Sequence, residues 1–146
     1  MPYLLRITLI ALALLGTVSC TSKPIQNPDR TLHASIHSDR AQMQQAIVKA
    51  LVGRGWTVQK ITPQLVQAQI TVRGQYHAEI DIPYRADHYR IQYRDSSGLD
   101  YKDGKIHKNY IRWVRLLDRD IVRDLKDNQN ERTAKQLSEA ALVKPL

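Results

Sequence analysis

Residues 66–82 decide the fold, because apolar and polar side chains alternate there on both sides of one glycine: VQAQITV (66–72), RGQ (73–75) and YHAEIDI (76–82). Alternation with a period of two gives a β-strand one apolar face and one polar face. The short link around Gly74 predicts that the two strands are antiparallel neighbours. If Val72 lies opposite Tyr76, every further apolar side chain on one strand meets an apolar side chain on the other. One face of this hairpin is therefore expected to be dry.

The segments around the hairpin extend it into a meander. After a turn at 83–88, residues 89–94 alternate in the same way, and a shorter alternating run at 56–60 comes before the hairpin. The sequence predicts an antiparallel sheet of three or four strands. One more short strand is expected at 32–36, where apolar and polar residues also alternate.

The charges predict how the third strand pairs. Placing Ile82 opposite Tyr89 also sets Asp81 opposite Arg90 on the wet face. An opposite-charge pair across strands stabilises a sheet by roughly 0.2–1 kcal/mol. We therefore expect this register for the second hairpin.

Two amphipathic helices are predicted to cover the dry face. The first follows Ser38, a good N-cap residue, and its apolar side chains recur at helical spacing: Met43, Ala46, Ile47, Ala50 and Leu51. The second begins at about His107 and has a similar stripe: Tyr110, Trp113, Val114, Leu117, Ile121 and Leu125. The predicted fold class is α+β, a two-layer sandwich in which both helices lie on one face of the antiparallel sheet.

The first 20 residues resemble a targeting segment rather than part of this domain. One charged residue, Arg6, precedes an apolar run at 7–15, and small residues at 16–19 lead to Cys20. This order is the pattern of a secretory signal peptide. The apolar run is shorter than the roughly 20 residues that a membrane-spanning helix needs. We therefore expect the chain to be exported.

Small residues directly before the single cysteine, Thr17-Val18-Ser19-Cys20, resemble the lipobox of bacterial lipoproteins. The resemblance implies cleavage before Cys20 and attachment of palmitate or similar acyl chains to it. Two or more such chains hold a protein stably on a membrane. Thr21, where Asp would favour retention, implies sorting to the outer membrane, facing the periplasm. The alternative is an ordinary secreted protein that is cut nearby and keeps an unpaired Cys.

The predicted organisation follows from these segments. Residues 1–19 are a signal peptide, and 20–30, with two prolines and little to bury, are a lipidated flexible tether. Residues 31–127 form the α+β domain. Residues 128–146 lack strong hydrophobes and are expected to form a helical or frayed tail.

The chain is basic, with 22 Lys and Arg against 14 Asp and Glu and a formal net charge of +8. Such a balance favours anionic partners. Export makes nucleic acid the least suitable of these and leaves anionic lipids or acidic glycans, or simply a solvated surface. Six basic residues lie around the second helix: Lys102, Lys105, Lys108, Arg112, Arg115 and Arg119.

A second resemblance lies between residues 93 and 114. Tyr93-Arg94-Asp95-Ser96, Leu99, Tyr101, Ile106-His107, Tyr110 and Trp113-Val114 are similar to a motif of small proteobacterial lipoproteins of unknown function. Ile111 departs from that motif, where Asn is common. The resemblance implies no activity. It selects the candidate binding residues Asp95, Ser96, Tyr101, His107, Tyr110 and Trp113, which either fix the loop to the second helix or form a shallow pocket for a small ligand or peptide.

The residues for catalysis or metal binding do not form a known pattern. Ser96 and His107 are present, but a nucleophile elbow G-x-S-x-G is missing and Asp95 adjoins the serine instead of orienting the histidine. The remaining histidines are dispersed, so we expect no metal, no cofactor and no enzyme.

The sequence thus favours a non-enzymatic, membrane-anchored binding or docking module of the cell envelope, with another envelope protein as partner. The alternative is a lipoprotein that binds a small ligand or lipid between the second helix and the sheet. A filled core with an exposed sheet edge would favour docking, and an open apolar cavity would favour the ligand.

Overall fold

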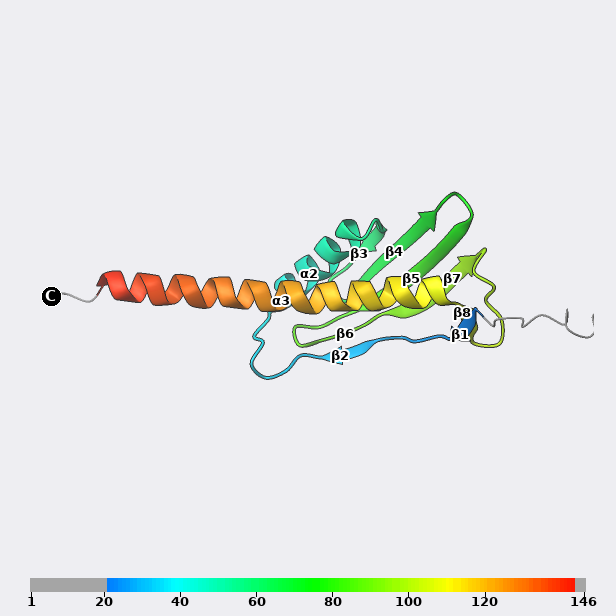
Figure 1. The fold of residues 1–146 in the computed structure, drawn as a ribbon. Coiled ribbons are helices and arrows are strands. Elements are labelled where there is room, and N and C mark those ends of the chain that lie inside the picture. The colour runs from blue at the N-terminus through cyan, green and yellow to red at the C-terminus, as the bar shows by residue number, and fades with distance from the viewer. Residues whose placement is uncertain (1–20, 144–146) are drawn as a thin grey trace, which may run out of the picture.

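A computed structural model of the protein describes residues 21–143. The signal peptide, the lipobox and Cys20 lie outside these residues, as do residues 144–146. The described chain forms β1 (Ser22–Pro24), β2 (Asp29–Thr31), α2 (Arg40–Gly53), β3 (Thr57–Ile61), β4 (Leu65–Val72), β5 (Tyr76–Pro83), β6 (His88–Arg90), β7 (Gln92–Ser97), β8 (Lys105–His107) and α3 (Lys108–Val143). Figure 1 shows their arrangement. The predicted α+β class is confirmed.

The central sheet has the strand order β3-β4-β5-β7, with every neighbouring pair antiparallel. The register predicted for the first hairpin is confirmed, since Val72 pairs with Tyr76 and the apolar residues behind them pair in turn. Gly74 has a φ of 67° in the turn, a conformation that glycine adopts without steric cost.

The register predicted for the second hairpin is wrong by two residues. Asp81 pairs with Gln92, not with Arg90, because the turn is tighter than expected. Tyr84 and Tyr89 form an antiparallel β-bridge. Between them, Arg85 N donates to His88 O (2.7 Å). A shift of two residues keeps the same side chains on the dry face.

Helix α2 begins one residue later than the sequence indicated. Its N-cap is Asp39, whose carboxylate accepts from Gln42 N (2.8 Å), while Asp39 N donates to Gln42 Oε1 (3.0 Å). This reciprocal pair is a capping box. Ser38 Oγ instead donates to the carbonyl of Asp39. The five apolar residues predicted for the inner face of the helix are all buried.

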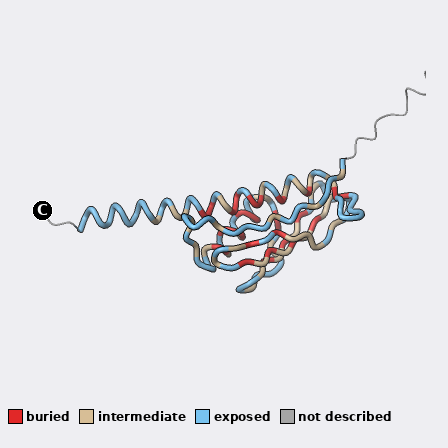
Figure 2. The backbone as a smooth tube through the Cα atoms, turned by 90° about the horizontal axis from the view of Figure 1, so that it is seen from below, coloured by how far each residue is buried: buried red, intermediate tan, exposed pale blue. Residues whose placement is uncertain are grey.

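Helix α3 begins at Lys108, as predicted, and runs for 36 residues. Its buried side chains end at Leu125. Beyond residue 132 every described residue of the helix is exposed, and Figure 2 shows this part of α3 projecting from the body of the domain. A helix of 36 residues is about 54 Å long at 1.5 Å per residue. The expected tail is therefore helical up to Val143.

The buried faces of both helices and the dry face of β4 and β5 form one hydrophobic cluster. The largest fully buried side chains are Tyr89, Tyr110, Met43, Ile47, Leu51, Ile80, Ile82, Ile91, Leu99, Ile106, Leu117 and Ile121. Within residues 21–143, neither helix is long and apolar enough to cross a membrane.

The strand predicted at 32–36 is wrong, since these residues form a turn in which Ile36 N donates to His33 O (2.8 Å). The flexible tether expected for residues 20–30 also differs from the structure. From Ser22 onward this segment is paired to the domain, β1 with β8 and β2 with β6. Prolines are tolerated here because each paired run is a short edge strand.

Candidate functional site

Two of the candidate binding residues, Tyr101 and Tyr110, contact the ring of Tyr93. The ring of Tyr93 stacks on Tyr101 with 4.5 Å between centroids and meets Tyr110 edge-on at 5.7 Å. Tyr110 is fully buried and Tyr101 is half exposed. Burial raises the pKa of the Tyr110 hydroxyl, so this group stays protonated. The cluster joins β7, the following loop and α3.

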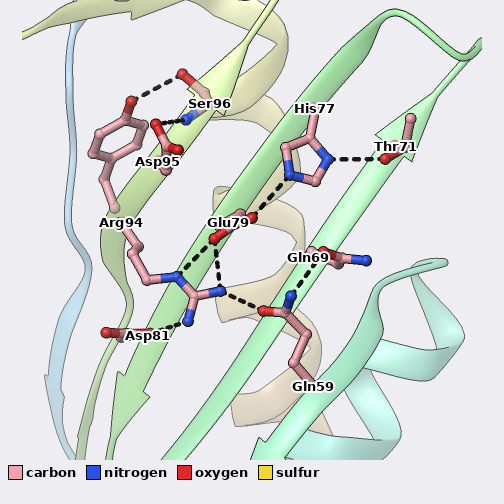
Figure 3. Close-up of polar contacts among 10 residues, drawn as sticks. Gln59, Gln69, Thr71, His77, Glu79, Asp81, Arg94, Asp95 and Ser96 are labelled. Atoms are coloured by element: carbon pink, nitrogen blue, oxygen red, sulfur yellow. Dashed lines mark hydrogen bonds and ion pairs between the residues drawn. The ribbon is translucent and has the colours of Figure 1, made fainter.

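Asp95 and Ser96 fix the start of that loop. Ser96 N donates to Asp95 Oδ1 (2.8 Å), and the Ser96 hydroxyl lies 2.9 Å from the Tyr93 hydroxyl. Figure 3 shows both contacts. Asp95, Ser96 and Tyr101 line an open depression of about 690 Å³ over residues 93–101. Three of the six candidate residues therefore share one concave surface.

The other candidates do not join this surface. His107 Nδ1 accepts from Asn109 N (3.2 Å), at the first turn of α3. Trp113 is half-buried against the core. Tyr110 is fully buried and contacts Tyr93, which lines the depression. Since the described contacts of His107 and Ser96 go to different partners, a serine–histidine pair is not assembled here.

A polar network on the open face of the sheet was missed by the sequence analysis. Arg94 Nε donates to Glu79 Oε2 (3.0 Å) and its Nη1 donates to Asp81 Oδ1 (3.1 Å), while Nη2 reaches the amide oxygen of Gln59. The amide of Gln59 in turn donates to Gln69 (2.7 Å). Figure 3 shows that these side chains come from β3, β4, β5 and β7. The network links all four strands across their wet face.

Thr71, His77 and Glu79 continue the network in an order that resembles a hydrolytic triad. The Thr71 hydroxyl lies 2.9 Å from His77 Nδ1, and His77 Nε2 lies 3.1 Å from Glu79 Oε1. The hydrogen bond from His77, together with Arg94, lowers the pKa of Glu79 below its usual value. Thr71 and His77 form the second pair from the turn between β4 and β5. Their side-chain contacts with each other and with Glu79 order this part of the sheet surface.

Asp118 of α3 holds the N-terminal segment on the domain. Its carboxylate is 4% exposed and accepts from Arg30 Nε (3.0 Å), from Arg30 Nη2 (2.6 Å) and from the Tyr89 hydroxyl (2.7 Å). Burial and the adjacent Asp118 charge raise the pKa of Tyr89. This contact, called the Asp118 clamp below, joins β2, β6 and α3.

Two further buried carboxylates on α3 hold helix α2. Asp120 pairs with Arg54 and Asp124 pairs with Lys49. The hydrogen bond from Arg54 lowers the pKa of Asp120. The apolar stripe of the second helix gave no indication that Asp120 and Asp124, at its border, are buried.

Basic residues predicted around α3 are exposed, as expected for such side chains. Lys23, Lys108, Arg112 and Arg115 line a groove of about 280 Å³ between β1 and the start of α3. Arg119 differs, since its guanidinium lies 3.7 Å from the carboxylate of Asp120.

The space between α3 and the sheet is occupied by the core. Tyr110, Leu117 and Ile121 are fully buried and belong to the same hydrophobic cluster as the dry face of the sheet. Within residues 21–143, no three His, Cys, Asp or Glu side chains lie together in a group that could hold a metal ion.

No protein-family model matches the chain, and no curated protein sequence matches it either. The likeness to small proteobacterial lipoproteins stays a prediction from the quoted residues alone.

Proposed function

We propose that the chain is a lipoprotein of the bacterial cell envelope, anchored through acyl chains on Cys20 and facing the periplasm, with the outer membrane as the favoured site. It acts as a non-enzymatic module that binds another envelope protein. The anchor rests on the pattern of residues 1–20.

A binding role agrees with the way the domain is filled. The core between the helices and the sheet is packed, and the depression over residues 93–101 is open and lined largely by polar groups. These features support docking over the alternative of a small-ligand pocket beneath α3.

The projecting part of α3 is the observation that carries the docking proposal. Residues 133–143 are exposed throughout, and Leu137, Leu142 and Val143 are 68%, 86% and 80% exposed. An exposed helix with apolar side chains gains stability when it lies in a groove of a partner.

A photo-crosslinking amino acid placed at Leu137 in living cells tests this role. The matched control is Val52, an apolar residue of α2 that is 63% exposed. We expect position 137 to form one specific adduct with an envelope protein and position 52 to form none. An identical adduct pattern at both positions, or no adduct at 137, would contradict the docking proposal.

A further inference from the structure

The chain enters the domain at the N-terminal end of α3 and is fixed there. Lys108 N donates to the carbonyl of Thr21 (3.0 Å), and Ile25 N donates to the carbonyl of Gly104 (2.8 Å). Between these bonds β1 pairs with β8. Cys20 is the next residue, and consecutive Cα atoms are about 3.8 Å apart. Acyl chains on Cys20 would therefore hold this end of the domain directly against a bilayer.

The surface around this point is basic. Five exposed cations lie on β1, on the loop before β8, on β8 and on the first turns of α3: Lys23, Lys102, Lys105, Lys108 and Arg112. The carboxylates of the same loop are Asp100 and Asp103, both exposed. Within residues 21–143, the ion pairs of the protein involve none of the five cations. Their charge is available to a ligand.

Part of this surface is concave. The groove of about 280 Å³ is lined by Lys23, Lys108, Asn109, Ile111, Arg112 and Arg115, four of them cations and none a carboxylate. Lysine and arginine are the side chains that bind phosphate groups most effectively. We call this groove and the adjoining Lys102 and Lys105 the basic end.

We propose that the basic end binds the anionic phospholipid headgroups of the membrane that holds Cys20. The orientation part of this inference rests on the proposed anchor, whereas headgroup binding depends only on described residues. A phospholipid surface is favoured over an acidic glycan because the basic end adjoins Thr21, the residue next to the acylation position. Since β1 and β8 lie at one end of α3 and Val143 at the other (Figure 1), this contact directs the exposed part of α3 away from the bilayer.

Vesicle flotation tests headgroup binding without the anchor. The probe is the chain from residue 20 onward with Cys20→Ser, which keeps the whole described core and the paired N-terminal segment. We expect it to float with vesicles that contain phosphatidylglycerol and not with phosphatidylcholine alone. High salt should release it, because the Debye length shortens to about 3 Å at 1 M. Equal binding to both vesicles would overturn the proposal.

Matched double substitutions locate the contact. Each basic residue near an anionic membrane contributes about a factor of five to binding, so Lys108→Gln with Arg112→Gln should weaken partitioning about thirtyfold. Lys126→Gln with Lys135→Gln removes the same charge about 21 Å or more further along α3 and should change vesicle partitioning less than threefold. Equal losses in the two variants would show a diffuse charge effect and overturn the proposal.

Two outcomes distinguish headgroup binding from the proposed anchored function and from binding of an acidic glycan. If the mature protein from cells carries an unmodified Cys20 while the Cys20→Ser chain binds phosphatidylglycerol vesicles, headgroup binding stands and the anchored function fails. If a soluble acidic polysaccharide binds through Lys108 and Arg112 and anionic vesicles do not, the lipid assignment is wrong.

Discussion

At the scale of single residues, Gly98 shows a close approach of two backbones. It follows β7 with a φ of +71°, and a Cβ built there would lie 2.1 Å from the carbonyl oxygen of Gln75. Side chains rarely adopt this φ, and the atom it meets belongs to the backbone of the turn between β4 and β5. The loop that contains the depression therefore depends on glycine at this position.

Gly98→Ala should lower the free energy of unfolding by about 3 kcal/mol or more, through backbone strain and the clash together. Gly104 is the matched control, since it has the same φ and open space around it. Gly104→Ala should cost only the strain, about 1–2 kcal/mol. Urea denaturation of both variants measures the difference, and equal costs would contradict the packing described for Gly98.

The Asp118 clamp can be tested in the same way. Asp118→Ala leaves the buried Tyr89 hydroxyl with only the backbone carbonyl of residue 118, at 3.2 Å, as its acceptor and frees Arg30, so we expect a loss of about 1–3 kcal/mol. Asp127→Ala, at an exposed position of the same helix, should change the stability by less than about 0.5 kcal/mol. A negligible effect of Asp118→Ala on thermal unfolding would show that the clamp does not contribute to stability.

Sequence patterns did not reveal this clamp for a physical reason. Arg30 and Asp118 are 88 residues apart, and neither lies within a hydrophobic pattern that would mark it as buried. The same holds for Arg94, whose partners come from two other strands, β3 and β5. Such contacts join residues that are distant in the sequence and come together only in the folded chain. The alternation of a strand and the spacing of a helix give no information about them.

At the scale of elements, the start of α2 offers a test of which residue is the N-cap, the predicted Ser38 or the observed Asp39. Asp39→Ala removes the acceptor of the capping box and should destabilise the protein by about 1 kcal/mol. Ser38→Ala should destabilise the protein by only a few tenths of a kcal/mol, since the Ser38 hydroxyl contacts no N–H group of the helix. Chemical denaturation with the reverse ranking would restore Ser38 as the N-cap.

The pairing of β2 with β6 should depend on pH. Hydrogen bonds from His88 and Arg90 lower the pKa of Asp29 below its usual 3.8. Because the folded pKa lies below the unfolded one, the stabilisation is complete well above pH 3.8 and is lost as the pH falls through the folded pKa. We expect the amides of Leu32 and Ile91 to lose protection in acid before those of β4 and β5.

Hydrogen-exchange protection factors at successive pH values measure this order. Asp29→Asn should make the protection of Leu32 independent of pH in the acidic range. Simultaneous loss across β2 and β4 in the unsubstituted protein would contradict a local acid-sensitive contact.

Elements with a repeated pattern were predictable and short paired runs were not. Eight alternating residues define β4, and the first hairpin register followed from them. By contrast, β1 and β2 contain three residues each, too few for a period to show, and Pro24 and Pro28 are typical of a loop. The second hairpin was misaligned because the charge pairing chosen for Arg90 competes with Asp29, its actual partner.

At the scale of the whole molecule, the α+β class followed from two amphipathic helices and one dry sheet face. The candidate site was predicted only in part, because the sequence motif combines residues of the loop with residues of the helix that face elsewhere. The close attachment of residues 21–31 changes the expected relation to the membrane. A flexible tether would let the domain move freely relative to the membrane, whereas the paired segment fits the proposed contact between the basic end and the headgroups.

The lipid anchor on Cys20 can be tested by measuring the mass of the mature N-terminal peptide, purified from cell membranes. We expect a chain that begins at Cys20 and carries acyl chains on its sulfur and its amino group. An unmodified thiol at Cys20, or a mature chain that begins elsewhere, would contradict it.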